Sequence, residues 1–167
     1  MVRRFTATVA MISRLFGMLA AGLVGAAILV VCEMVFMRYV LRASTVWQTE
    51  FVIYSLVAAT FLGSPYVLLT KGHVNVDLLP NYLAPGPRRV LGIVASLIGI
   101  TFCAALAWKG YAYFAEALHK GWTTDTVWAL PLWIPTLSIP LGIGLLTLQY
   151  LADIVALIAG HDVDGEI

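Results

Sequence analysis

Four long apolar segments follow one another along the chain, and short polar stretches separate them. They cover residues 15–37, 47–69, 90–108 and 132–158. Because about 20 consecutive apolar residues are enough for a helix to cross the hydrocarbon core of a bilayer, the pattern predicts an all-α membrane protein. We expect four transmembrane helices within one domain, residues 14–159.

The two ends of the chain differ from the spans. Apolar residues recur on one helix face at Phe5, Val9, Ile12 and Phe16. Residues 1–13 are therefore expected to form an interfacial segment, either separate from the first span or continuous with it. Arg3 and Arg4 also resemble the start of a signal peptide, but the apolar run after them exceeds the ~7–15 residues of such a signal. The acidic residues 160–167 are expected to form a disordered tail.

The third apolar segment continues as a helical pattern beyond its span. A helix over residues 88–120 would measure about 48 Å, well beyond a hydrocarbon core of about 30 Å. Charged residues are dispersed among aromatic ones in its last turns, at Lys109, Glu116, His119 and Lys120. Either the helix tilts strongly or its last three turns extend beyond the bilayer, and we favour the second. A proline-rich turn is predicted before the helix, at residues 78–87.

Proline and small residues suggest how the helices pack. Pro65 cannot donate a hydrogen bond to the carbonyl of Phe61, so another group must satisfy that oxygen within the membrane. Small residues recur every four positions at Gly17, Ala21 and Gly25, and at Ala95, Gly99, Cys103 and Ala107. Such stripes allow close helix packing, which we expect inside this chain rather than against another chain.

Composition narrows the class of protein. The 167 residues are 61% hydrophobic and only 11% charged, with a mean hydropathy of +0.93, whereas a soluble domain has about 25% charged residues. A net charge of +1 provides no basic surface for nucleic acid. Cys32 and Cys103 fall inside apolar segments, where packing residues are expected rather than a disulfide or a metal site.

Basic residues predict the orientation. With four spans, both termini lie on one side of the membrane. Six of the ten basic residues flank that side (Arg3, Arg4, Arg14, Lys71, Arg88 and Arg89), and four flank the other (Arg38, Arg42, Lys109 and Lys120). Because basic residues favour the cytoplasm, we expect both termini to be cytoplasmic.

Few residues suggest a reaction. His73 and Asp77 lie one helical turn apart, but two ligands do not close a metal site. Their spacing is also one residue shorter than the His–Asp motif of membrane acyltransferases. We expect no catalytic, cofactor-binding or metal-binding residues, and therefore no enzyme. An alternative is a membrane anchor of an electron-transfer complex, although His73, His119 and His161 do not form a facing haem-binding pair within the spans. Another is a small membrane transferase.

The second span begins with two distinctive residues. Trp47 is an amphipathic ring suited to the membrane–water interface, and Glu50 lies one turn inside it. An unpaired carboxylate at this depth is costly. We therefore expect Glu50 to pair with Arg38 or Arg42 across the short outer loop.

Several motifs occur in a definite order along nearly the whole chain. They are Arg38-Tyr39 at the end of the first span, Trp47-x-x-Glu50, Gly63, His73-Val74-x-Val76-Asp77, and the proline-rich start of the last span with Pro131, Pro135 and Pro140-Leu141-Gly142. This succession resembles the small membrane (Q) subunit of tripartite ATP-independent periplasmic (TRAP) transporters.

The resemblance implies a multi-pass, non-catalytic subunit of a secondary transporter in the bacterial inner membrane. In such symport systems a large membrane (M) subunit carries substrate and sodium as an elevator, and a periplasmic substrate-binding protein delivers an organic acid. The Q subunit is then a fixed scaffold for the M subunit, in contact with membrane lipid. By the same resemblance Arg38, Trp47, Glu50, His73 and Asp77 serve folding and subunit docking.

A second contact is expected at the outer end of the third helix and in the loop after it. Four candidate residues lie there: Glu116, His119, Trp122 and Asp125. In the predicted orientation they face the periplasm. Because loops held on rigid elements commonly carry recognition, we expect them to help dock the periplasmic binding protein.

Overall fold

The computed structural model describes residues 2–70 and 85–158. All the secondary-structure elements assigned in these residues are helices. They are α1 (Val2–Tyr39), α2 (Val46–Leu69), α4 (Pro85–Lys120), α5 (Trp133–Thr136) and α6 (Ser138–Ile158). Four stretches are long and apolar enough to cross a membrane: Arg4–Tyr39, Val46–Leu69, Ile93–Lys120 and Trp133–Val155. The predicted all-α fold with four candidate membrane spans is confirmed.

The helices extend beyond the predicted spans. α1 is continuous from Val2, so the amphipathic segment and the first span form one helix. α4 runs to Lys120 as predicted, but it begins at Pro85, inside the predicted turn at 78–87. Proline is tolerated there because the first turn of a helix leaves its N–H groups unpaired in any case. The tail at 160–167 lies outside the described residues.

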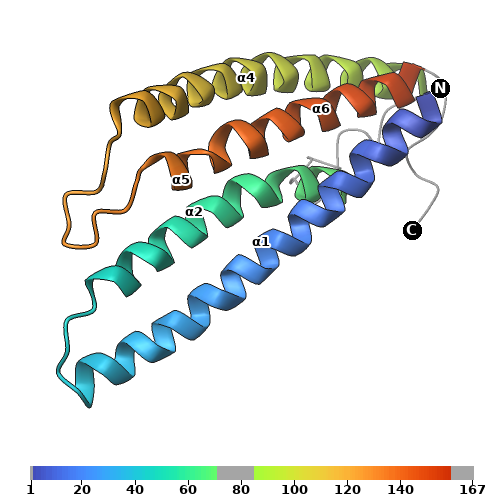
Figure 1. The fold of residues 1–167 in the computed structure, drawn as a ribbon. Helices are drawn as coiled ribbons and strands as arrows, with labels where there is room; N and C mark the ends of the chain where they lie inside the picture. Colours follow the sequence, from blue (N-terminus) through green and yellow to red (C-terminus); the bar gives the residue numbers. More distant parts are fainter. Residues whose placement is uncertain (1, 71–84, 159–167) are drawn as a thin grey trace.

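The helices lie side by side in a row (Figure 1). α4 packs on α5 and α6, α6 packs on α2, and α2 packs on α1, which also contacts α6. α1 and α4 form the two edges of the row. Residues 40–45 join α1 to α2 and residues 121–132 join α4 to α5, both at the same end. We call this the outer end and the opposite one the inner end.

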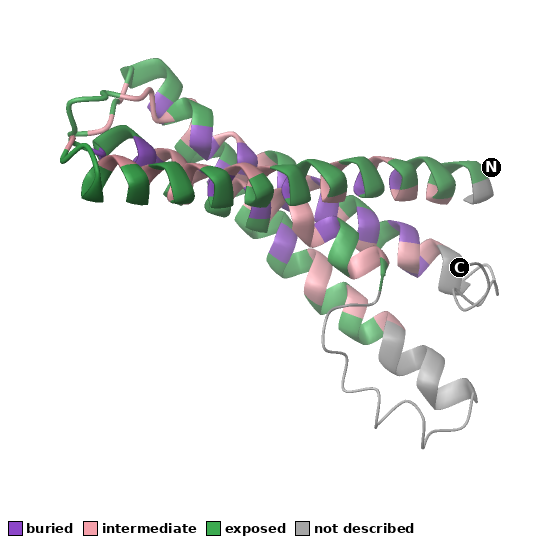
Figure 2. Cartoon of the chain, turned by 90° about the horizontal axis from the view of Figure 1, so that it is seen from below, coloured by how far each residue is buried: buried purple, intermediate pink, exposed green. Residues whose placement is uncertain are grey.

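This arrangement buries little of the apolar surface. In the most apolar 18-residue stretch of α1, and likewise of α4, only 11% is buried within the chain, compared with 44% in the corresponding stretch of the last span. Figure 2 shows that α1 is exposed along most of one face. The interior consists of small clusters, one of Val9, Leu145 and Ala152 and another of Cys103, Ile143 and Leu146. Cys103 is therefore a packing residue, as predicted.

α2 and α6 meet very closely where Pro65 interrupts the hydrogen bonding of α2. The freed carbonyl of Phe61 accepts a hydrogen bond of 2.7 Å from the hydroxyl of Ser64, which confirms that another group satisfies it. Gly142 of α6 packs against the same peptide unit. A Cβ on Gly142 would overlap the carbonyl of Phe61 and lie 3.0 Å from the Leu62 nitrogen. The absence of a side chain therefore permits this approach.

The two stripes of small residues have different surroundings. A Cβ on Gly17 would lie 2.5 Å from the ring of Tyr66 in α2, and one on Gly99 would lie 3.0 Å from the ring of Tyr150 in α6. These positions pack inside the chain, as predicted. A Cβ on Gly25 would meet no described atom within 4 Å, so the prediction of internal packing is wrong there. Ala27, two residues further along α1, is 2% exposed, whereas Gly25 is exposed, so Gly25 lies on a face of α1 that the other helices do not cover.

A buried polar contact joins the first and last helices. Ser13 is fully buried and donates a hydrogen bond of 3.0 Å to Oε1 of Gln149, which is 3% exposed. Nε2 of Gln149 donates to Asp153, one turn further on, at 3.1 Å. The Gln149 amide is thus bonded at both ends, through its oxygen to α1 and through its nitrogen within α6.

Candidate functional site

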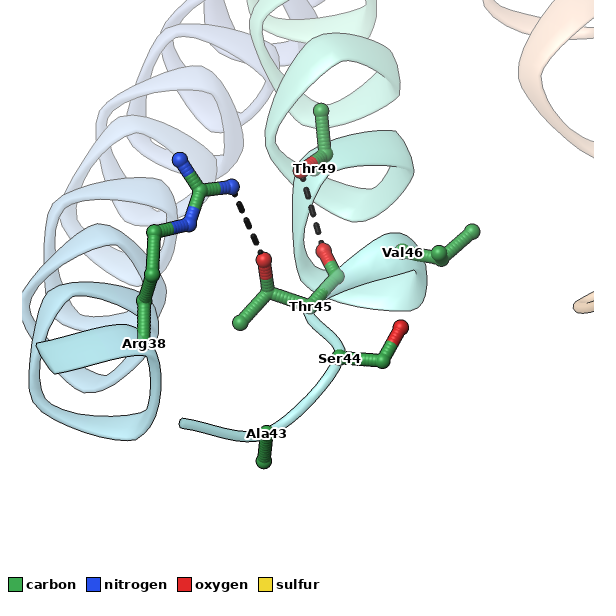
Figure 3. Close-up of a pocket in the computed structure, with 6 residues that line it drawn as sticks. All are labelled: Arg38, Ala43, Ser44, Thr45, Val46 and Thr49. Carbon is green, nitrogen blue, oxygen red and sulfur yellow. Dashed lines mark hydrogen bonds between the residues drawn. The ribbon is translucent and has the colours of Figure 1, made fainter. Parts of the chain in front are cut away.

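The predicted docking residues of the first two helices lie together at the outer end. Arg38, in the last turn of α1, donates a hydrogen bond of 3.0 Å from Nη2 to the hydroxyl of Thr45 (Figure 3). Thr45 immediately precedes α2 and is 7% exposed. This contact fixes the end of α1 against the start of α2.

Trp47 connects this corner to the other outer segment. Its ring meets the ring of Trp128 edge to face, with 6.4 Å between the centroids and an interplanar angle of 65°. Aromatic pairs in this geometry stabilise a contact by about 0.5–1.5 kcal/mol beyond their buried area. The start of α2 and the segment 121–132 are therefore joined at the outer end.

Glu50 is buried, but the predicted ion pair is wrong. The residue is 8% exposed, and neither carboxylate oxygen has a hydrogen-bond partner among the described residues. Arg38 instead bonds to Thr45, and no hydrogen bond joins Glu50 to Arg42 in the described part of the chain.

The geometry of α2 explains this outcome. Glu50 precedes Phe61 by three helical turns, so both lie on the side of α2 that faces α6. The face toward α1 instead carries Gln48, whose Nε2 donates to Glu33 at 3.3 Å. Arg38 lies in the last turn of α1 and Arg42 directly after that helix, so both are on the α1 side of α2, away from Glu50.

The segment 121–132 is folded closely onto the end of α4. The amide of Trp122 donates to the carbonyl of Ala117 at 3.1 Å. Its ring lies 6.0 Å from that of Tyr113, and the ammonium of Lys120 stands 5.3 Å from its centroid. Trp122 thus anchors the segment rather than projecting from it.

Hydrogen bonds across the segment hold its tip in place. The amide of Thr124 donates to the carbonyl of Leu130, and the amide of Leu130 donates to the hydroxyl of Thr124, each at 3.0 Å. Beyond these bonds the tip exposes Asp125 and Val127, the latter 97% exposed. A fixed loop with an exposed apolar tip is suited to contact with another protein.

The remaining outer candidates lie on the surface of α4. Glu116 and Lys120 form an ion pair of 2.5 Å, one turn apart and exposed, and such a pair contributes little to stability. His119 is exposed beside them. His73 and Asp77 lie outside the described residues.

Several residues that organise the structure were missed by the sequence reasoning. Gln48 and Gln149 are polar residues within apolar spans, and that signal alone could have drawn attention to them. Gly142 was noted only as part of the Pro140-Leu141-Gly142 motif, and nothing in the sequence indicates that it meets Phe61.

Comparison with known proteins identifies the family. Residues 27–160 match the family described as "Tripartite ATP-independent periplasmic transporters, DctQ component". The chain belongs to this family. It is therefore a small permease component of a TRAP transporter, a multi-pass membrane protein rather than an enzyme, and the resemblance noted in the sequence is confirmed.

Three relatives of this DctQ-family chain are informative. The C4-dicarboxylate TRAP transporter small permease protein DctQ of Rhodobacter capsulatus is 29% identical over 106 residues, which cover 64% of this chain and 46% of that protein. A protein of the same description from Vibrio cholerae serotype O1 is 23% identical over 178 positions, which cover 89% of this chain and 77% of that protein. The isethionate TRAP transporter permease protein DctMQ of Oleidesulfovibrio alaskensis is 22% identical over 112 residues, which cover 67% of this chain and 18% of that protein. The chain thus spans less than half the length of the Rhodobacter relative.

Proposed function

We propose that this chain is the stationary small subunit of a TRAP transporter. It braces a large M subunit that moves as an elevator and takes up an organic acid with sodium. The acid arrives on a periplasmic binding protein. Both termini of the chain lie in the cytoplasm, so the outer end faces the periplasm.

The row of helices supports the bracing role. Because little of α1, α2 and α4 is buried within the chain, broad apolar faces are available to lipid and to another membrane subunit. Docked beside a transporter, such a row enlarges the part that stays fixed in the bilayer. Aromatic residues at the outer end, including Trp47 and Trp128, resist vertical displacement because their rings favour the membrane boundary.

The relatives support the choice of partner and substrate class. The isethionate relative is a single permease protein, and only 18% of its length corresponds to this chain. Joining a homologous segment to a much larger one in a single polypeptide favours a large permease partner for this chain. C4-dicarboxylates and isethionate are both organic anions, which supports an organic acid as substrate.

The first test is transport by reconstituted components. Vesicles that contain this chain alone are expected to show no uptake of organic acid, because an elevator requires a moving partner. Vesicles with the chain, its large membrane partner, the binding protein and a sodium gradient are expected to show uptake. Flux with this chain alone would contradict the proposal, as would full transport by the large partner without this chain.

The second test concerns the outer loop. The double variant Asp125→Asn with Val127→Ser changes only exposed side chains at the tip, so the fold is expected to remain intact. We expect the affinity of the reconstituted transporter for its binding protein to fall about tenfold, as for the loss of one important interface side chain. Surface plasmon resonance would measure it, with Arg4→Gln at the inner end as control. Unchanged affinity would exclude the tip as a docking surface.

A further inference from the structure

The contact between Arg38 and Thr45 lines an open polar pocket at the outer end (Figure 3). It has a volume of about 350 Å³ and lies between the end of α1 and the start of α2. Its lining residues are Arg38, Ala43, Ser44, Thr45, Val46 and Thr49. Arg38 is the charged residue among them, and none is acidic. The pocket is therefore suited to an anionic group.

Most of the hydrogen-bonding capacity of Arg38 is unused within the described residues. A guanidinium has five N–H donors in a planar fork, and the one hydrogen bond of Arg38 within the described residues goes to Thr45. Because Thr45 is buried and holds the fork in place, the remaining donors are oriented in advance. Such a fork matches two oxygens of a phosphate group.

The start of α2 adds to the positive potential. Thr45 precedes the helix, but its hydroxyl faces Arg38, and α2 has no side-chain cap hydrogen bond. The first N–H groups of this 24-residue helix are therefore left without a capping side chain beside the pocket. A helix start of this kind attracts anions. Arg42, in the same connection, contributes a second positive charge at this end.

The surroundings indicate where the anion comes from. Tyr39 is 78% exposed and Trp47 is 45% exposed at the same end of the two helices. Exposed aromatic rings at the end of a membrane span mark the boundary where lipid headgroups lie. One turn deeper, Val35 and Phe36 of α1 are also exposed and offer an apolar surface to acyl chains.

We propose that the pocket binds the phosphate group of a membrane phospholipid. The Arg38 fork and the start of α2 hold the phosphate, and the acyl chains lie along the exposed apolar side of α1. Basic pockets between membrane helices recognise lipid headgroups in this way. The proposal requires only that α1 and α2 span the membrane, so it does not depend on the bracing role.

Native mass spectrometry of the full chain, stripped of lipid in detergent, tests this assignment. The probes are dioleoylphosphatidylglycerol, dioleoylglycerol, which has the same acyl chains without phosphate, and inorganic phosphate. We expect wild type to bind the phospholipid at least tenfold more tightly than either other probe. Arg38→Gln is expected to weaken phospholipid binding about tenfold or more, because a charge-assisted fork is lost.

Matched variants separate the site from general charge effects. Arg14→Gln removes an exposed arginine from the same helix, far from the pocket, and is expected to bind like wild type. Thr45→Val keeps the charge but removes the acceptor that orients the fork, and it is expected to weaken binding several-fold, even if Arg38→Gln does not fold. Equal phospholipid binding by wild type and the Thr45 and Arg38 variants would overturn the proposal. Equal affinity for inorganic phosphate or for dioleoylglycerol would also overturn it.

Discussion

Gly142→Ala is expected to lower the stability of the purified chain by about 1–3 kcal/mol or more, the range for forcing extra volume into a packed interface. The new Cβ would overlap the backbone carbonyl of Phe61 and crowd the Leu62 nitrogen. A flexible side chain could turn aside, but these backbone atoms can move only with the whole of α2. The substitution must therefore separate α2 from α6.

Gly144→Ala is the matched control because it adds the same atom to the same helix. A Cβ there meets nothing within 4 Å, and alanine is a better helix former than glycine by about 1 kcal/mol. We expect unchanged or higher stability. Thermal unfolding in a single detergent, followed by circular dichroism, measures both variants. If Gly142→Ala unfolds at the same temperature as Gly144→Ala, the close α2–α6 contact is wrong.

Two substitutions of buried polar residues are expected to change the stability of the isolated chain in opposite directions. Gln149→Leu should destabilise the chain by roughly 1–2 kcal/mol, because it removes both hydrogen bonds of a bonded amide and leaves the buried Ser13 hydroxyl without that acceptor. Glu50→Leu should stabilise the isolated chain by about 1–3 kcal/mol, because it removes a buried carboxylate that has no partner in the described structure.

Unfolding of the isolated chain by sodium dodecyl sulfate in mixed micelles compares these two variants with wild type. A loss of stability in Glu50→Leu would mean that the carboxylate is bonded after all. The assembled transporter provides a separate measurement. Weaker association of Glu50→Leu with the large subunit, despite a stable chain, would support the docking role assigned to Glu50.

The outer end shows how far sequence reasoning reached. Trp47 was predicted to mark the membrane boundary, and the structure places it at the outer end, against Trp128. The ring contact itself joins residues far apart in the chain, and no local pattern specifies it. The pairing of Glu50 failed for a related reason. Nearness along the chain suggested Arg38, but the face of α2 that carries Glu50 is turned toward α6.

A local rule was enough to predict that the carbonyl of Phe61 needs a new hydrogen-bond donor. Proline at residue 65 must free that oxygen, so the need for a donor could be predicted, and the hydroxyl of Ser64 supplies it. That Gly142 is the neighbour of Phe61 could not be predicted in this way, because it depends on where α2 and α6 cross. Likewise, the polarity of Gln149 was visible in the sequence, but its bond to Ser13 depends on how α1 lies against α6.

The sequence by itself determined the number of apolar spans and the family, because hydrophobic runs and motif order are properties of the chain read locally. The tertiary structure alone decided that the helices form a row, which glycines lie in contacts, and which buried polar groups have partners. Lipid is as apolar as the helices, so hydrophobicity drives a helix into the membrane without selecting its neighbour. That selection depends on close packing and hydrogen bonds between residues distant in sequence.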